Sequence, residues 1–560
     1  MKKLLIWYIL LVGYINAATP DPVFGENGMV VSTSRQASIA GIEILKKGGN
    51  AVDAACATGF VLAVTSSSNG NIGGGGFMVA HKADSTIFTL DYREIAPAAS
   101  HRDMFLDSNG EVIDNMSLRT RAASGVPGSV DGLLKAWKDH GSGNISRREL
   151  LAPAIALAER GFELSHYEAK RFNDNKDLFL KNKAAAKIFI RGDRKPWKAG
   201  DRFIQKDLAR TLKRISREGR DGFYTGKTAD LIIAEMNRGI GLITHWDLLH
   251  YESKYRNPIR GSFNEYDIIS MGLPSSGGTI LLEMLNMLEN FPLTELGWNS
   301  SDYIHLLTEV ERRAYADRAE HLGDVDFWTP PLSMLTSKKY AKDRMNDFYA
   351  DKATASTVVF AGDPSGYESP ETTHYSVIDK DGNAVSVTTT INLGYGGGIL
   401  VEGAGFFLNN EMDDFSVKPW VPNAFGLVGN AANAIQPGKR PLSSMTPTIV
   451  LKNKEPFIIL GSPGGSRIIT AVLQTILNVT VHNMDIQEGV SAPRVHSQWL
   501  PDVIMAESYS IVKDVETSLI NKGHKILPYK NIGDVNAILI NEYGYFGGTD
   551  IRGENTAIGY

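Results

Sequence analysis

Two runs rich in valine, isoleucine and threonine meet at a tight turn in residues 371–391, and they constrain the fold more than any other feature. The sequence reads ETTHYSVIDKDGNAVSVTTTI, with DKDGN between the runs. β-Branched residues favour strands, and a short glycine-containing turn between two such runs predicts a β-hairpin. A three-residue loop, 380–382, with Gly382 in the left-handed conformation, pairs Asp379 with Asn383.

This loop also sets the expected register of the hairpin. Continued to its open end, the register places Thr372 opposite Thr390. Directly opposed side chains have Cβ atoms about 5 Å apart, so the Thr390 hydroxyl can hydrogen-bond to Thr372. A β-bulge would shift this pairing.

Helical and strand patterns alternate through the rest of the chain. Residues 34–46 predict an amphipathic helix that ends at Gly48-Gly49, and residues 51–65 predict a nearly all-apolar, buried one. Helices covering sheets are therefore the expected α+β architecture. Further helices are expected at 129–139, 148–160, 206–219, 279–290, 301–323 and 468–481, and strands at 86–92, 267–271, 448–452 and 457–460.

Length alone suggests three or four domains of about 150 residues each. The 560 residues contain no low-complexity linker and no internal repeat, so one large domain fits better. The 58 Lys and Arg residues nearly balance the 63 Asp and Glu residues, and no basic stripe is interleaved with aromatics. Nucleic acid is therefore not expected as a partner.

The N-terminus has the layout of a secretory signal peptide. Two lysines precede an apolar stretch at 4–15, and Asn16-Ala17-Ala18 follows, so we expect residues 1–17 to be removed after Ala17. An uncleaved anchor is the alternative, but the stretch is shorter than the roughly 20 residues that span a bilayer. The mature chain is expected in the periplasm or medium, without a membrane anchor. Its lone Cys56 cannot form an intramolecular disulfide.

Several blocks of sequence, in this order along the chain, resemble the γ-glutamyltranspeptidase family. Thr372 opens the block TTHYS, and the similarity extends over essentially all of the mature chain. The blocks are GNAVDAACAT (49–58), GGGGF (73–77), LDYREIAP (90–97), LPSSGG (273–278), AYADRAEHLGD (314–324), NNEMDDFSVKP (409–419), KRPLSSMTPTIV (439–450) and GSPGGSRIIT (461–470).

The resemblance implies the N-terminal nucleophile hydrolase fold, a four-layer αββα sandwich made as an inactive precursor. The precursor cuts itself between Glu371 and Thr372. A large fragment, 18–371, and a small catalytic fragment, 372–560, then remain as one intertwined domain, a heterodimer of the chain's own pieces.

The same resemblance implies roles for residues around Thr372. A threonine hydroxyl is a weak nucleophile, and the α-amine freed by cleavage can serve as its base. Thr390 orients the nucleophile, and the N–H groups of Gly464 and Gly465 form an oxyanion hole. Here the implied reaction is transfer of a γ-glutamyl group from glutathione or a similar amide to water or to an amino acid.

A γ-glutamyl group carries a free carboxylate and a free ammonium, so its pocket needs both a cation and acceptors. By resemblance Arg93 grips the carboxylate, and hydroxyls add donors. Carboxylates and an amide accept from the ammonium. The hydroxyls are those of Ser443 and Ser444, and the acceptors are Asn392, Glu411 and Asp414.

Residues 418–427, KPWVPNAFGL, occupy the place of a lid loop that in some bacterial members carries a tyrosine where this chain has Phe425. Phenylalanine can cover the pocket but cannot donate a hydrogen bond, so we expect a lid that shields by packing alone. Trp420 is either a gate or a filler under the loop. His374 is expected to be structural, because the α-amine already supplies the base.

No cofactor and no catalytic metal are expected. The glycine runs at 73–76 and 396–398 lack the strand, GxGxxG, helix order of dinucleotide sites, and NNEMDDF lacks Ca²⁺-loop spacing. Two alternatives stay open. A cephalosporin acylase shares the family's fold and self-cleavage but binds a dicarboxylic side chain without the α-amine, and an uncleaved binding protein would keep only the fold.

Overall fold

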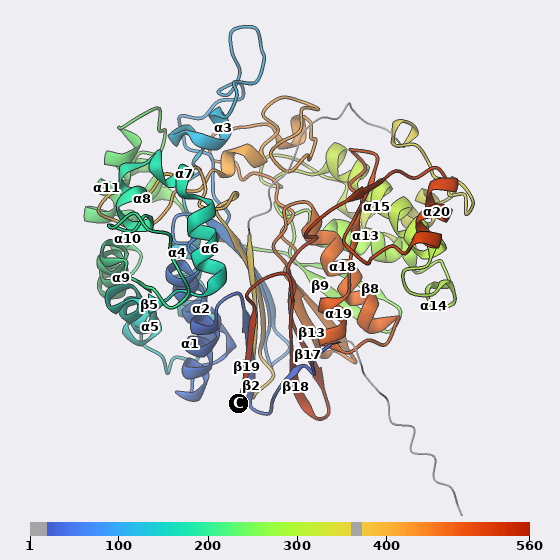
Figure 1. Ribbon diagram of the computed structural model, residues 1–560, viewed down its shortest axis with the longest axis horizontal. Helices are drawn as coiled ribbons and strands as arrows, with labels where there is room; N and C mark the ends of the chain where they lie inside the picture. Colours follow the sequence, from blue (N-terminus) through green and yellow to red (C-terminus); the bar gives the residue numbers. More distant parts are fainter. Residues whose placement is uncertain (1–18, 360–371) are drawn as a thin grey trace, which may run out of the picture.

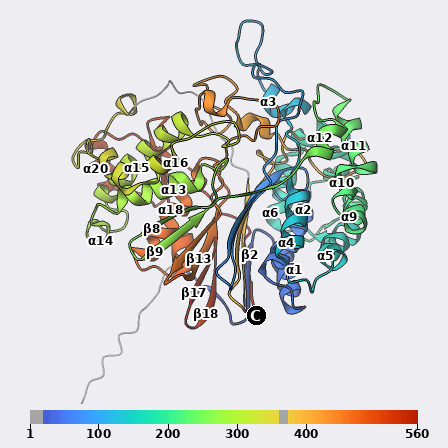
Figure 2. The ribbon, with the colours of Figure 1, turned by 180° about the vertical axis from the view of Figure 1, so that it is seen from behind.

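Two antiparallel sheets lie face to face at the centre of the molecule, with helices packed on both outer faces (Figure 1). The computed structural model describes residues 19–359 and 372–560. The predicted signal peptide and Glu371 lie outside these residues. The expected four-layer αββα sandwich is confirmed, and Figure 2 shows the same layers from behind.

The first sheet contains the predicted hairpin at its centre. All its neighbouring strands are antiparallel. Its order is β19 (Thr556–Gly559), β2 (Gly28–Ser32), β10 (Thr373–Asp379), β11 (Ala384–Thr390), β3 (Gly75–His81), β4 (Ile87–Asp91) and β7 (Lys254–Arg256).

The second sheet also has only antiparallel neighbours. Its order is β1 (Val23–Gly25), β18 (Gly544–Thr549), β17 (Asn536–Asn541), β13 (Glu455–Gly461), β12 (Thr448–Lys452), β9 (Tyr266–Ser270) and β8 (Ile259–Phe263). Strands β10 and β11 of the first sheet face β13 and β17 of the second.

The outer layers are the helices that the sequence predicts, each within a few residues of its expected ends. The first sheet is covered by α1 (Arg35–Lys46), α2 (Ala51–Thr65), α4 (Ser129–His140), α5 (Arg147–Arg160) and α9 (Lys206–Glu218). The second is covered by α13 (Gly277–Leu288), α15 (Ser301–His321) and α18 (Arg467–Thr480). Every residue of α2 is buried, as its apolar sequence predicts.

The sequence analysis did not predict several shorter elements. Few of these helices complete more than two turns, and each of these strands has only two or three residues. These are α3 (Met116–Arg119), α6 (His166–Asp174), α7 (Lys176–Leu180), α8 (Lys183–Phe189), α10 (Asp221–Tyr224), α11 (Gly226–Met236), α12 (His245–His250), α14 (Leu293–Leu296), α16 (Leu332–Leu335), α17 (Lys338–Arg344), α19 (Ile486–Ser491), α20 (Lys513–Asn521), β5 (Phe162–Glu163), β6 (Arg202–Phe203), β14 (Val495–His496), β15 (Ile504–Ala506) and β16 (Ile526–Pro528).

Strand β2 shows how the layers divide the apolar residues. Met29 and Val31 pack between the two sheets, whereas Val30 packs under the helices. Successive side chains of a strand point to opposite faces, so a strand buried on both faces is apolar at every position. Each sheet therefore contributes to two hydrophobic layers.

The predicted register of the hairpin is confirmed. Thr373 pairs with Thr389 and Ile378 with Ala384, and the N–H of Asp379 donates to the carbonyl of Asn383 across 3.2 Å. Gly382 has φ +87°, the left-handed conformation expected of it.

The chain before residue 360 and the chain after residue 371 are interleaved in both sheets. In the first, β10 lies between β2 and β11, and β11 pairs with β3 on its other side. A strand from one part of the chain thus completes the backbone hydrogen bonding of the other. Among the described residues, no helix is both long and apolar enough to cross a bilayer.

Candidate active site

Thr372 lies directly before β10, at the open end of the central hairpin, and is buried. Its carbonyl oxygen accepts a hydrogen bond from Nδ2 of Asn69 at 2.7 Å. The next residue is also anchored, because the hydroxyls of Thr373 and Thr33 are 2.8 Å apart. Contacts from the segments after β2 and α2 therefore hold this end of the strand.

A narrow cavity of about 20 Å³ opens beside Thr372 and collects most of the residues selected from the sequence. They come from seven separate places along the chain, which only the folded sheets bring together. The lining includes Arg93, Thr372, Thr390, Asn392, Glu411, Asp414, Phe425, Ser443, Ser444 and Gly465. Gly464 lines a second, larger cavity that also contains Thr372.

Arg93 forms the charged centre of the narrow cavity. It follows β4, and its N–H donates to Oδ1 of Asp91 at 2.9 Å. Its Nη1 donates to Oε1 of Glu411 and its Nη2 to Oδ2 of Asp414, whose residues form a 3₁₀ turn, Glu411–Asp414. The cation and the acidic acceptors expected for a zwitterionic substrate are thus paired with each other. A cavity of this size holds about one water. A larger ligand can therefore enter only if the Arg93 guanidinium separates from the carboxylates of Glu411 and Asp414.

Two acceptor atoms at this cavity have no hydrogen-bond partner within the described part of the chain. They are Oδ1 of Asn392 and Oε2 of Glu411. The Asn392 amide is oriented by its own Nδ2, which donates to the carbonyl of Asn410 at 2.9 Å. Burial raises the pKa of Glu411 and of Asp414, although Arg93 opposes the shift. A bound cationic group would satisfy both acceptor atoms and would favour the ionised forms of Glu411 and Asp414.

Two glycines form the turn between β13 and α18. Gly464 has φ +140° and Gly465 has φ +58°, conformations that glycine adopts without strain. In residues 19–359 and 372–560, neither backbone N–H donates a hydrogen bond. Each glycine shares a cavity with Thr372. Two free backbone donors beside a nucleophilic side chain can stabilise a developing oxyanion.

Arg318 also lines the narrow cavity, and the sequence analysis missed it. It lies on α15, within a block quoted above only as a point of family similarity. Its Nε donates to Oγ of Ser276 at 2.9 Å and its Nη2 to Oγ of Ser444 at 3.2 Å. Burial lowers its pKa to about 10, so it stays protonated at neutral pH.

Ser276, from the LPSSGG block, connects Arg318 through hydrogen bonds to the segment that contains Ser443 and Ser444. Its Oγ donates to the carbonyl of Ser443 at 2.6 Å, and its N–H donates to the same oxygen at 2.8 Å.

The signal in the sequence that could have pointed to Arg318 was the density of charged residues in ERRAYADRAE at 311–320. Charges on every face of a helix predict that some of them are buried.

Phe425 and Leu427, from the segment predicted to form a lid, line this cavity. Phe425 is buried, and a Cβ added to Gly465 would lie 2.4 Å from its ring. Trp420 is half-buried and packs against the core formed by the two sheets and the outer helices.

His374 is held between the two sheets. Its Nδ1 is 2.9 Å from Oγ1 of Thr388, and its Nε2 is 3.0 Å from Oγ of Ser376. Burial lowers its pKa to about 3. Because both nitrogens contact strand hydroxyls, His374 has the structural role expected of it.

The second cavity, of about 470 Å³, is also lined by Thr372. Its size falls within the range of small-molecule sites. Its lining carries both basic and acidic side chains, those of Arg171, Lys530, Arg552, Glu168, Asp534 and Glu554. Thr372 thus lines both a narrow charged cavity and a wide one of mixed charge.

A sequence model of γ-glutamyltranspeptidase matches residues 37–560, nearly the whole chain. The chain belongs to the γ-glutamyltranspeptidase family. A glutathione hydrolase proenzyme of Pseudomonas sp. (strain A14) is 44% identical over 526 residues, covering 94% of this chain and 91% of that protein.

Two further similarities connect this γ-glutamyltranspeptidase to acylases. The acylase ACY 1 proenzyme of Pseudomonas sp. (strain SE83) is 36% identical over 530 residues, covering 93% of this chain and 91% of that protein. A cephalosporin acylase from Bacillus halodurans superposes with a TM-score of 0.85 at 24% identity, covering 99% of both chains. The second similarity shows the shared fold.

Proposed function

We propose that this γ-glutamyltranspeptidase cuts itself between Glu371 and Thr372 and then transfers γ-glutamyl groups from glutathione and related amides to water or to amino acids and peptides. The observation that carries the proposal is the position of Thr372. It lines both a cavity with paired charges and a wide cavity, and each of these also contains a glycine, Gly465 or Gly464, whose N–H has no partner in the described chain.

Thr372 acts as the nucleophile. In the uncut chain its nitrogen belongs to a peptide bond and cannot accept a proton. Cleavage frees an α-amine with an ordinary pKa of roughly 8, which takes the hydroxyl proton during attack and returns it to the leaving amine. Oγ1 of Thr390 accepts from the N–H of Asn392 at 2.8 Å, which fixes this side chain at the cavity that Thr372 also lines, where it orients the nucleophile.

The γ-glutamyl zwitterion replaces the internal ion pairs of the narrow cavity. Its carboxylate takes Arg93 from the two acids and also accepts from the hydroxyls of Ser443 and Ser444. Its ammonium donates to Glu411, Asp414 and Asn392. Because binding exchanges one set of buried ion pairs for another, no buried charge is left without a partner.

Attack on the γ-carbonyl forms a tetrahedral oxyanion, which the N–H groups of Gly464 and Gly465 stabilise. The leaving amine departs into the wide cavity, leaving a γ-glutamyl ester on Thr372. Water or an amino-acid amine then enters from the same side and attacks the ester carbonyl. A peptide carboxylate there can pair with Lys530.

The fragments 18–371 and 372–560 remain one folded unit after cleavage, since each sheet contains hydrogen-bonded strands from both. Residues 1–17 direct export, and the mature enzyme works in the periplasm or the medium. Neither nucleic acid nor a cofactor takes part in this reaction.

A glutaryl acylase is the second candidate, supported by the similarity to the ACY 1 proenzyme. A glutaryl group lacks the α-ammonium, so it would leave Glu411, Asp414 and the unpartnered Oδ1 of Asn392 without a cation. This favours the γ-glutamyl substrate. Comparing the turnover of glutaryl-anilide and γ-glutamyl-anilide separates the two activities.

The first experiment purifies the wild type and Thr372→Ala and analyses both on a denaturing gel with N-terminal sequencing and γ-glutamyl-anilide turnover. The wild type is expected to give two fragments, the smaller beginning at Thr372, and the variant to stay whole and inactive. A wild type that turns over substrate without splitting contradicts the proposed nucleophile. One that neither splits nor turns over substrate supports a binding protein.

A further inference from the structure

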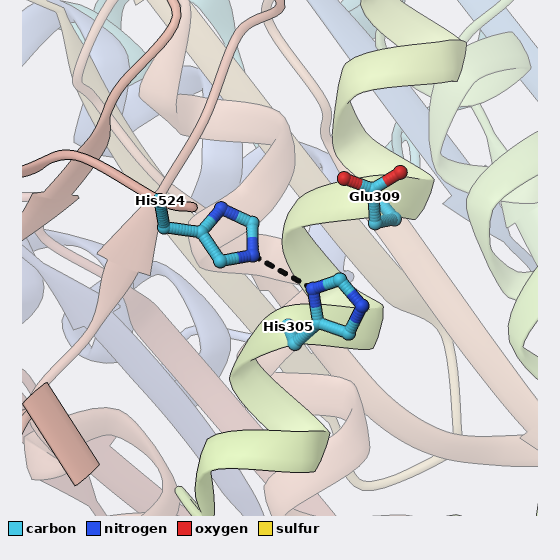
Figure 3. Close-up of side chains that lie close together, drawn as sticks. All are labelled: His305, Glu309 and His524. Atoms are coloured by element: carbon cyan, nitrogen blue, oxygen red, sulfur yellow. Dashed lines mark hydrogen bonds between the residues drawn. The ribbon is translucent and has the colours of Figure 1, made fainter. Parts of the chain in front are cut away.

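Three potential metal ligands meet where α15 approaches the segment after α20 (Figure 3). His305 and Glu309 lie one helical turn apart on the same face of α15, and His524 approaches from the other segment. Their ligand atoms all lie within 4.8 Å of one another, and all three residues are buried. None of them lines the cavities beside Thr372.

The hydrogen bonds of His305 fix which of its nitrogens carries a hydrogen. Its Nε2 lies 2.8 Å from the carbonyl oxygen of Tyr349, which can only accept, so this nitrogen carries the hydrogen. Its Nδ1 therefore presents a lone pair, toward Nε2 of His524 at 2.7 Å. A histidine whose other nitrogen donates to a backbone carbonyl is the usual form of an oriented metal ligand.

We propose that His305, Glu309 and His524 bind one Zn²⁺ ion in place of the hydrogen shared by the two imidazoles. The hydrogen on Nε2 of His524 moves to Nδ1 of the same ring, so both facing nitrogens offer lone pairs. For two Zn–N bonds of about 2.0–2.1 Å in a tetrahedral site, the nitrogens must separate to about 3.3 Å. That requires a movement of about 0.6 Å from the observed contact.

The surrounding charges are compatible with a dication. Glu309 contacts Arg312 and Arg313, and these arginines also pair with Asp502 and Asp347. Three carboxylates against two guanidinium groups leave one net negative charge. Each carboxylate oxygen has two lone pairs, so Glu309 can keep these contacts and still bind an ion.

The ligand types select among metals. Two imidazoles and a carboxylate suit Zn²⁺, with water at the fourth position, better than they suit Ca²⁺ or Mg²⁺.

The ion would link the two parts of the chain. His305 and Glu309 precede the cleavage site proposed above, and His524 follows it. This consequence rests on the proposed function, whereas binding of the ion does not.

The test is calorimetric titration of ZnCl₂ into untagged, chelator-treated protein. Wild type is expected to bind one Zn²⁺ per chain, and His305→Gln and His524→Gln to bind at least tenfold more weakly. The amide introduced by His524→Gln can still donate to Nδ1 of His305, which limits loss of folding. The matched control is His250→Gln, at an exposed histidine on α12, which should bind as wild type does.

Two further measurements distinguish loss of zinc binding from failure of self-cleavage and from misfolding of the glutamine variants. Thr372→Ala should bind Zn²⁺ as tightly as wild type, so failure of self-cleavage leaves this test intact. If the glutamine variants do not fold, Co²⁺ replaces Zn²⁺ in the wild type, and the absorption of tetrahedral, imidazole-bound Co²⁺ is the readout. Absence of stoichiometric binding, absence of that absorption, or unchanged affinity in the variants overturns the proposal.

Discussion

Nη2 of Arg318 lies 3.2 Å from Oγ of Ser444, and this contact sets the direction of the serine hydroxyl. A guanidinium can only donate, so the serine oxygen accepts and its own hydrogen must point elsewhere. Within the described residues that hydrogen has no acceptor, and Ser444 lines the cavity beside Thr372. Arg318 therefore prepares a donor for an incoming carboxylate.

Replacing Arg318 should weaken recognition of the donor carboxylate. In Arg318→Met the serine hydroxyl loses its orienting donor and the cavity loses a positive charge, so we expect KM for γ-glutamyl-anilide to rise about tenfold or more. The measurement is steady-state kinetics on protein whose self-cleavage has been verified on a gel.

The control substrate for this variant is 4-aminobutyryl-anilide, which lacks the α-carboxylate. Its kcat/KM should fall much less than that of the γ-glutamyl substrate. Equal losses on both substrates would assign Arg318 a purely structural role. Arg318→Lys keeps the charge and should retain part of the affinity.

Gly465→Ala should reduce turnover at least tenfold. The new Cβ would lie 2.4 Å from the ring of Phe425, and φ +58° strains any residue with a side chain by about 1–2 kcal/mol. We expect kcat/KM for γ-glutamyl-anilide to fall and to recover in part in the double variant with Phe425→Ala. Full activity in the single variant would argue against an oxyanion hole at this turn.

Phe425→Tyr should shift the reaction toward transfer. The added hydroxyl supplies a donor that can fasten the lid and reduce access of water to the ester. One hydrogen bond of about 0.5–1.5 kcal/mol corresponds to a two- to tenfold change in the ratio of transfer to hydrolysis. The measurement compares formation of γ-glutamyl dipeptide with release of glutamate, and undetectable hydrolysis by the wild type would contradict the expectation of a weaker lid.

His374 should make the fold sensitive to acid. Its folded pKa of about 3 lies below the ordinary value of 6.5, so the stability it contributes is present above pH 6.5 and is lost as the pH falls toward 3. At pH 4.5 this loss is about 2–3 kcal/mol. Urea unfolding at pH 7 and at pH 4.5 gives the free energy of unfolding at each pH. Its decrease between the two should be smaller in His374→Gln than in the wild type by this amount. An equal drop in both proteins would assign the acid sensitivity to other groups.

The central hairpin could be predicted from local sequence. The pairing of Thr373 with Thr389 follows from the length of one turn and the position of Gly382, both of which are properties of neighbouring residues. The long helices α2 and α15 could also be predicted from neighbouring residues, α2 from an unbroken apolar run and α15 from a helical pattern over many turns. The composition of the candidate site followed from family similarity.

The contacts within the site depend on tertiary structure. Arg93 and Glu411 are 318 positions apart in the chain, and Arg318 and Ser444 are 126 apart, so no local pattern could reveal either contact. The same holds for His305 and His524, which meet 219 positions apart. The sequence by itself determined the central hairpin, four further strands, the long helices and, through family similarity, which residues are chemically suited to a γ-glutamyl group. Only the packing of two interleaved sheets decided which charges are paired, because burial removes the water that would otherwise solvate them.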